Sequence, residues 1–250
     1  MIQLKNAAQI ELMKAAGRIT GEALLKAGEA VREGVSTAYL NDLAREYIEK
    51  QGAYPSFLGY GGFSGSVCIS INDEVIHGIP SKTRLLANGD IVKIDVGAFY
   101  RGFHGDSANT FPVGRVSDSA SRLIEATKES FFKGLKAFRS GGRIGDIGSA
   151  IESHVAGFGY SPVRKFIGHG IGKELHEDPE VPNYGTAGRG QRLCVGMALA
   201  IEPMINIGGS EVRILDDKWT VVTLDGSLSA HYEHTAVLTE EGAVLTTLIN

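Results

Sequence analysis

Acidic residues inside apolar, glycine-rich runs carry most of the chemical information in this sequence. Asp95 lies in IVKIDVGAF, a run typical of a central strand, and Asp106 follows in GFHGD. Both flank Tyr100–Arg101, so a hairpin centred on that pair would place them face to face. Facing carboxylates repel each other and need a cation or a shared proton between them. The alternative is a solvated pair at the edge of a hairpin.

Two glutamates occupy similar surroundings. Glu202 lies in MALAIEPM and Glu233 in AHYEHT, each beside a strand-like run. A lone acid in a strand core costs on the order of several kcal/mol unless it is compensated. The alternatives are an edge-strand glutamate beside Pro203 and a surface glutamate in a polar run.

Three histidines occur close to glycines. His169 lies in GHGIG, His176 follows it, and His77 precedes the sequence GIP. Histidine is the commonest metal ligand and the usual acid or base near neutral pH, and the glycines would leave room for a ligand. Each imidazole could instead be a hydrogen-bonded loop or core residue. The glycine spacing fits neither the phosphate-binding loop GxxxxGK[ST] nor the dinucleotide fingerprint GxGxxG.

Taken together, these residues form an oxygen-rich set of metal ligands. Four carboxylates and one imidazole suit Mn, Fe(II), Co or Zn, and not a soft thiolate site. Two divalent ions would neutralise four carboxylates, whereas one ion would leave two negative charges, so the set favours a dinuclear centre. Its members are Asp95, Asp106, His169, Glu202 and Glu233.

The elements that must position this set are two helical pairs and a series of strands. Hydrophobic periodicity predicts helices over 9–33, from Ser36 to Gly52, and around 123–138 and 147–158. Strand-like runs cover 67–71, 91–99, 103–111, 163–167, 197–207, 212–215, 219–224, 232–238 and 244–249. The mixture indicates an α+β fold.

The two halves of the chain share a spacing pattern. Gly34, Leu40, Gly52 and Pro55 recur as Gly141, Ile147, Gly159 and Pro162, each 107 residues later. No Pro/Ser-rich linker separates the halves, so we predict one domain over 1–250 with halves of about 9–111 and 119–249. A pseudo-twofold pair of halves would place a site at their junction.

Composition excludes several classes of protein. A net charge of −4 excludes a generally basic nucleic-acid binder. Two cysteines exclude a disulfide scaffold and a four-cysteine zinc site. The apolar runs are too short for a membrane span, and the first residues do not resemble a signal peptide. These observations predict a cytoplasmic protein.

Seven ordered segments of this sequence closely resemble those of type I methionine aminopeptidases. They are ISINDEVIHGIP (69–80), IDVG (94–97), GFHGD (102–106), GHGIG (168–172), LHEDPEVP (175–182), IEPM (201–204) and YEHT (232–235). The resemblance implies the pita-bread fold, in which two pseudo-twofold-related α+β halves hold a metal site at their junction.

The resemblance also implies a role for each ligand. Asp95 would bind the first of two divalent ions, which could be Co, Mn, Fe or Zn. Asp106 and Glu233 would bridge both ions, and His169 and Glu202 would complete the second.

For catalysis, the resemblance implies that a metal-bridged water attacks the scissile peptide carbonyl. Glu202 would carry the proton to the leaving amine, His176 would donate to the developing oxyanion, and His77 would hold the peptide beyond the cut. The pocket for the methionine side chain would include Tyr60, Phe63, Cys68 and Trp219, and its rim would differ from some members at Leu175 and Phe57.

The implied activity is removal of the amino-terminal methionine from nascent proteins and peptides whose second residue is small. Its partners would be nascent-chain termini, with the ribosome as one setting, and the enzyme would act as a monomer. An X-Pro dipeptidase or aminopeptidase P would share the five ligands, although GFHGD and LHEDP favour methionine removal. A non-catalytic binding protein on the same fold is the other alternative, and such proteins usually lack ligands.

Overall fold

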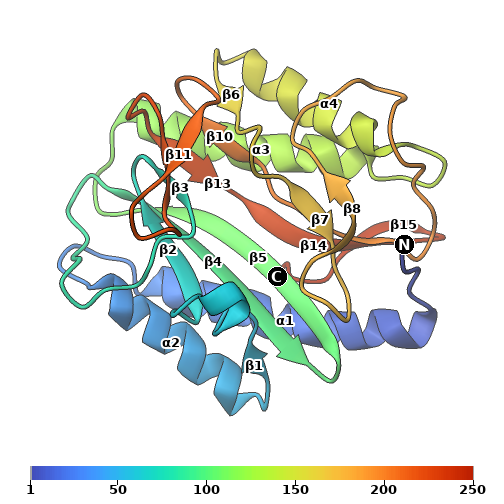
Figure 1. Ribbon diagram of the computed structural model, residues 1–250, viewed down its shortest axis with the longest axis horizontal. Coiled ribbons are helices and arrows are strands. Elements are labelled where there is room, and N and C mark those ends of the chain that lie inside the picture. Colours follow the sequence, from blue (N-terminus) through green and yellow to red (C-terminus); the bar gives the residue numbers. More distant parts are fainter. Residues whose placement is uncertain (1, 250) are drawn as a thin grey trace.

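Four α-helices pack as two pairs against a large curved sheet in the computed structural model, which describes residues 2–249 (Figure 1). The helices are α1 (Ala7–Glu29), α2 (Thr37–Lys50), α3 (Asp118–Ala137) and α4 (Ile144–Ala156). One apolar core joins the first pair to the strands before residue 113, and a second joins the other pair to the later strands. None of the helices in residues 2–249 has the length and hydrophobicity needed to cross a membrane.

Polar side chains start three of these helices. Asn6, Ser36 and Ser117 each accept a hydrogen bond from a first-turn backbone N–H, which satisfies one of the free donors there. The predicted helix 9–33 is wrong at its end, because α1 stops at Glu29. The N–H of Gly34 donates to the carbonyl of Leu86 at 2.8 Å, so the chain leaves the helix axis to make this tertiary bond.

Strands that are far apart in the sequence are neighbours in the large sheet. Its main path runs β1-β4-β5-β14-β9-β7-β8, with β2 beside β4 and β15 beside β14. The bounds are β1 (Tyr54–Pro55), β2 (Val67–Ile71), β4 (Ile91–Tyr100), β5 (Phe103–Pro112), β7 (Gly168–Gly170), β8 (Glu177–Val181), β9 (Ala198–Ile201), β14 (Glu233–Thr239) and β15 (Gly242–Leu245).

Two small sheets and a short helical turn complete the described elements. One sheet has the order β13-β10-β6 and the other β11-β12-β3. Their bounds are β3 (Glu74–Ile76), β6 (Ser161–Pro162), β10 (Met204–Asn206), β11 (Val212–Ile214), β12 (Val221–Thr223) and β13 (Ser229–His231), and the 3₁₀ turn η1 is Tyr60–Gly62.

Three of the predicted strands differ from the observed ones. The run 197–207 is two strands, because Pro203 has no N–H to donate and the chain passes from the large sheet to a small one there. The run 163–167 is a bend, and the short strand β6 precedes it. The last strand ends at Leu245, so most of 244–249 lies beyond it.

The hairpin of β4 and β5 has a different register from the expected one. Its two-residue loop is Arg101–Gly102, with φ of 50° and 86°. A tight hairpin turn needs positive φ at both central residues, and Gly102 adopts it without strain. Asp106 therefore lies opposite Gly97, and Asp95 lies opposite Ala108. The two carboxylates are diagonal neighbours on one face instead of directly opposed.

The 107-residue spacing recurs in the hydrogen bonds of the two halves. The N–H of Gly34 donates to Leu86, and the N–H of Gly141 donates to Leu193. An antiparallel bridge joins 36 to 85, and another joins 143 to 192. We therefore propose that 9–111 and 119–249 are an internal repeat within one domain.

The C-terminal segment packs against a glycine of α1, which gives a stability prediction. A Cβ atom at Gly17 would lie 2.4 Å from the carbonyl oxygen of Thr246, so Gly17→Ala forces backbone to move. We expect the free energy of unfolding to fall by about 1–3 kcal/mol in urea denaturation. Gly209→Ala is the control, since the nearest atom to its Cβ is 3.7 Å away, and its effect should stay within about 0.5 kcal/mol. Equal stability of the two variants would contradict this packing.

Candidate metal centre

A cavity of about 150 Å³ is lined by every residue predicted from the sequence to belong to the site. A volume of about this size accommodates a benzene-sized group in other proteins. Its lining consists of an acidic and imidazole side and an aromatic side. The lining residues are Asp95, Asp106, His169, Glu202, Glu233, His77, His176, Tyr60, Phe63, Cys68 and Trp219, together with Phe57 and Leu175.

Five neighbouring strands of the large sheet, or the residues directly beside them, supply the acidic side chains and one imidazole of this lining. Strands β4, β5, β14, β9 and β7 are neighbours in that order. Asp95 lies on β4, Asp106 on β5, Glu233 at the start of β14, and His169 on β7. Glu202 directly follows β9, where Pro203 ends the strand. The strand order thus brings together residues from both halves of the chain.

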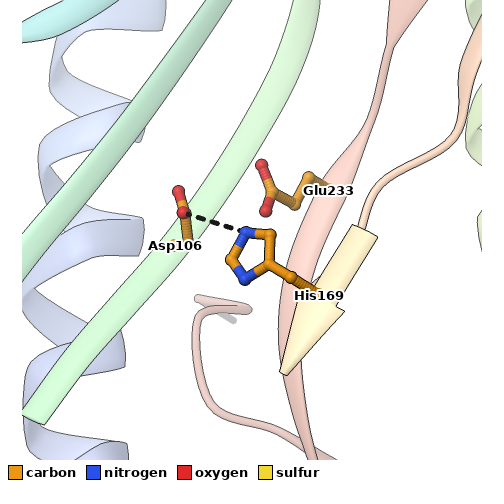
Figure 2. Close-up of side chains that lie close together, drawn as sticks. All are labelled: Asp106, His169 and Glu233. Carbon is orange, nitrogen blue, oxygen red and sulfur yellow. Dashed lines mark ion pairs between the residues drawn. The ribbon is translucent and has the colours of Figure 1, made fainter. Parts of the chain in front are cut away.

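Three of these side chains form a compact group (Figure 2). Asp106, His169 and Glu233 each offer one ligand atom, and the three atoms lie within 4.8 Å of one another. The Nε2 atom of His169 is 3.9 Å from Oδ2 of Asp106, and 3.5 Å from Oε1 of Glu202. Such separations leave space for an ion between the donor atoms.

The backbone fixes the proton of His169. Its Nδ1 lies 2.9 Å from the carbonyl oxygen of Gly170. A carbonyl only accepts, so Nδ1 must carry the hydrogen, and Nε2 of the neutral ring is left with a free lone pair. A ring held in this tautomer is the usual arrangement of a metal-binding histidine.

The glycines beside His169 have a packing role. A Cβ at Gly168 would lie 2.4 Å from the carbonyl oxygen of Ala200, and one at Gly170 would lie 2.1 Å from that of Asp178. The expectation that these glycines leave room for a ligand is therefore wrong. They allow β7 to lie close to β9 and β8, which fixes where the His169 ring points.

Burial raises the pKa of every carboxyl group in the centre. The pKa of Asp95 rises to about 7 because the group is buried. Burial and, next in size, a neighbouring carboxylate raise the pKa values of Asp106, Glu202 and Glu233 well above the usual range. Burial also lowers the pKa of His169 to about 3, so its ring is neutral. The site therefore favours added positive charge, supplied by protons or by a cation.

Unsatisfied oxygen atoms indicate that a cation fits this site. The Oδ1 atoms of Asp95 and Asp106 are buried and have no hydrogen-bond partner in the described part of the chain. Buried polar atoms nearly always have a partner, so each unpaired one requires an explanation. Carboxylate oxygens with one imidazole are donors that hard and borderline divalent ions prefer.

Two further histidines border the same cavity. The Nδ1 atom of His176 lies 2.7 Å from the hydroxyl of Tyr60, and its ring centroid is 4.2 Å from that of His169. His77 has a φ of 60°, a backbone conformation that costs about 1–3 kcal/mol in a non-glycine residue and clusters at functional sites. Burial lowers the pKa of His77 to about 4 and that of His176 below its usual value, so both rings are neutral.

The remaining lining residues of the cavity are mainly apolar. The ring of Trp219 meets the edge of Phe63 at 5.0 Å between centroids, and lies 6.3 Å from His77. Cys68 is paired with Asp95 across β2 and β4, and burial raises the pKa of its thiol well above the usual value. The thiol therefore stays neutral and packs as an apolar group. Such a surface suits a flexible apolar or thioether side chain.

One residue of the centre received no role in the sequence analysis. His231 is 1% exposed, and its Nε2 atom lies 3.9 Å from Oε2 of Glu202 and 3.8 Å from Oε2 of Glu233. The signal was present in AHYEHT, since residues two apart in an extended segment point to the same side. His231 and Glu233 have that spacing.

Comparisons with known proteins agree with this geometry. The sequence profile of metallopeptidase family M24 matches residues 11–240 of this chain. A methionine aminopeptidase of Clostridium acetobutylicum is 53% identical over 248 residues, which are 99% of this chain and 99% of that protein. The crystal structure of a methionine aminopeptidase from Thermotoga maritima has a TM-score of 0.98 at 42% identity and covers 100% of both chains.

More distant structures share the fold. A Xaa-Pro dipeptidase from Bacillus anthracis has a TM-score of 0.78 at 23% identity, with 99% of this chain and 62% of that chain covered. Identity at this level supports a common fold and carries no information on substrate.

Proposed function

Because this chain belongs to the methionine aminopeptidases of metallopeptidase family M24, we propose that it removes the amino-terminal methionine of peptides and nascent proteins when their second residue is small. The predicted fold is confirmed, since the similar structures have the pita-bread fold and this chain has the same mixed α+β architecture. The observation that carries the proposed function is one cavity whose lining combines five residues able to bind a metal ion with several aromatic residues.

A divalent metal is the cofactor that this family and this donor set support. We propose two ions, of Mn, Fe, Co or Zn, because two divalent charges balance four buried carboxylates. Asp95, Asp106 and Glu233 would hold one ion, and Asp106, Glu233, His169 and Glu202 the other. When bound, the ions would supply Lewis acidity for the peptide carbonyl and lower the pKa of water.

The remaining chemistry falls to the side chains around the centre. Glu202 would accept a proton and pass it to the leaving amine, and the position of its carboxylate 3.5 Å from Nε2 of His169 supports this role. If the Tyr60 hydroxyl donates to Nδ1 of His176, then Nε2 carries a hydrogen and can donate to the carbonyl oxygen as negative charge develops there. His77 would orient the peptide beyond the cut.

The apolar wall determines which first residue fits. We propose that Tyr60, Phe63, Cys68 and Trp219 hold the methionine side chain, since aromatic rings contact a thioether favourably. Phe57 and Leu175, which also line the cavity, complete this wall.

We also propose a setting for this reaction. The substrates are the amino termini of nascent chains, at or after the ribosome, and the enzyme works as a cytoplasmic monomer. The net charge of −4 argues against a general affinity for nucleic acid.

The proposed function is tested by comparing short peptides under the same metal conditions. With Mn²⁺ added, Met-Ala-Gln should lose its methionine, whereas Ala-Pro and Phe-Pro dipeptides, which have no amino-terminal methionine, should remain intact. Preferential cleavage of the X-Pro peptides would favour a prolidase-type activity. Binding of Met-Ala-Gln without cleavage of any peptide would favour a non-catalytic protein.

A second peptide tests the size of the site beyond the cut. Met-Ile-Gln places a stiff, β-branched side chain where a small one is expected. Overpacking of about 1–3 kcal/mol corresponds to roughly 5- to 150-fold slower cleavage than of Met-Ala-Gln. Equal kcat/KM for the two peptides would contradict the proposed size limit.

A further inference from the structure

His231 is held rigidly at the edge of the metal centre. It ends β13, where it pairs with Met204 of β10. Its N–H donates to Oγ1 of Thr110 at 2.9 Å, and the same hydroxyl donates back to the carbonyl of His231 at 2.8 Å. This double contact fixes the backbone of His231, and therefore the direction from which its ring enters the site.

The imidazole of His231 has no hydrogen-bond partner within residues 2–249. Both ring nitrogens are buried and unpaired, although the residue is only 1% exposed. By contrast His234, on the same segment, has contacts on both nitrogens, from Ser107, Thr247 and Tyr232. A buried and unpaired imidazole is costly, so it requires a function or a partner.

Two carboxylate oxygens close to this imidazole point to its partner. Its Nε2 lies 3.8 Å from Oε2 of Glu233 and 3.9 Å from Oε2 of Glu202. A carboxylate only accepts hydrogen bonds, so Nε2 must carry the hydrogen if it is to bond to either oxygen. A movement of about 1 Å would reach the usual N–H···O distance. The other oxygen of Glu202, Oε1, lies on the side of His169.

We propose that His231 is a positioning residue of the metal centre, whose Nε2–H holds the Oε2 atoms of Glu202 and Glu233 and so leaves Oε1 of Glu202 beside His169. This inference rests on the proposed metal-dependent function. His231 is absent from the lining of the cavity, and it acts through the two carboxylates. Outer contacts of this kind typically change metal affinity by about 10- to 100-fold when removed.

A matched pair of substitutions separates the effect of losing the hydrogen-bond donor from the effect of changing the shape of the side chain. His231→Gln keeps an N–H donor, and His231→Met has similar length without one. Isothermal titration of the full-length, chelator-treated protein with Mn²⁺ should give about 10- to 100-fold weaker binding for His231→Met. His231→Gln should stay within about 3-fold of the wild type. His231→Leu, a second variant without a donor, should behave as His231→Met does.

Two controls make the result decisive. Melting temperatures in chelator should be similar for the Gln and Met variants, because the difference between them concerns metal and not folding. His234→Gln alters a buried histidine whose nitrogens already have other partners, and should leave Mn²⁺ affinity unchanged.

Three results would overturn the positioning role. Unchanged Mn²⁺ affinity in His231→Met would show that the donor is unimportant, and an equal loss in His231→Gln would show that only the ring matters. Wild-type protein that cleaves Met-Ala-Gln without binding Mn²⁺ would overturn both this role and the metal-dependent function. Normal Mn²⁺ binding by the wild type without cleavage would overturn the proposed function alone.

Discussion

Removal of divalent ions should abolish cleavage of Met-Ala-Gln, and Mn²⁺ or Co²⁺ should restore it. A bound ion contributes several kcal/mol to the reaction, so kcat/KM should fall by at least about 10³-fold. The physical reason is the buried acidic set, in which Asp95 and Asp106 have oxygen atoms without a protein partner. The measurement is peptide cleavage after chelation, with residual metal determined by elemental analysis. Full activity of verified metal-free protein would contradict a metal-dependent reaction.

Metal binding should also stabilise the protein against heat. Buried carboxylates repel each other when no cation lies between them, so metal binds the folded state preferentially. At a free metal concentration 100 times the dissociation constant, this adds about 2.7 kcal/mol. For a chain of this length, that corresponds to a rise of roughly 5–10 °C in melting temperature. Asp106→Asn, which lacks one of the ligands, is the control and should show a smaller rise.

The size of this stabilisation should depend on pH. The raised carboxyl pKa values, about 7 for Asp95, mean that protonated groups stabilise the metal-free fold at low pH. This contribution is lost as pH rises from about 4 through the raised values. His169 has the opposite effect on the pH dependence of stability. Because its pKa is lowered, the neutral ring stabilises the fold above about pH 6.5, and this contribution is lost as the pH falls toward 3.

Between pH 6 and 8 the carboxyl groups therefore dominate. Metal competes with their protons, so the rise in melting temperature on adding Mn²⁺ should be larger at pH 8 than at pH 6. The same comparison on Asp106→Asn shows how much of the change comes from this carboxylate. A larger rise at pH 6 would contradict the assignment of buried carboxyl groups as the metal-binding set.

The residues of the centre could be found from the sequence because their chemistry is local. A carboxylate inside an apolar strand, such as Asp95, or directly after one, such as Glu202, is energetically costly without compensation, and the sequence shows this in a few neighbouring residues. The structure brings all the proposed ligands to one cavity. What the local pattern could not supply was the strand order that makes neighbours of β5 and β14, since such pairing depends on contacts across the whole chain.

The local sequence of the hairpin already favours the observed register. Turn chemistry favours positive φ at Arg101–Gly102, because glycine takes this conformation freely, whereas Tyr100 would be strained there. The shift moves Asp106 from a position opposite Asp95 to one opposite Gly97. Both carboxylates stay on the same face of the sheet, which explains why a wrong register still led to the right pair of residues.

Other differences arise from contacts that no short segment contains. After α1 ends at Glu29, the N–H of Gly34 donates to the carbonyl of Leu86, which lies on a distant loop. The glycines around His169 are explained by the backbone of Ala200 and Asp178. The sequence shows that these positions are glycine, but only the packed sheet shows which backbone atoms a Cβ atom there would clash with.

Glu202→Gln should yield a folded protein whose kcat is lower by roughly 10²-fold or more. The amide is nearly isosteric with the carboxylate but cannot carry a proton from water to the leaving amine, and it is a poorer metal ligand. The backbone should keep its place, since the carbonyl of Glu202 accepts a hydrogen bond from Nδ2 of Asn183 at 3.0 Å whatever the side chain is. The measurement is kcat and KM for Met-Ala-Gln at saturating Mn²⁺, with melting temperature and bound metal determined alongside.

A remote glutamate provides the matched control for this substitution. Glu22 lies on α1 and accepts a hydrogen bond from the hydroxyl of Tyr47, away from the cavity. Glu22→Gln makes the same chemical change and should leave kcat within about twofold, because Glu22 does not line the cavity and its amide oxygen can still accept from Tyr47. If Glu202→Gln retains bound metal and also stays within a few-fold of the wild type, another group must move the proton. A large loss with normal metal content and unchanged KM would place the defect in proton transfer itself, since binding of peptide and metal would be intact.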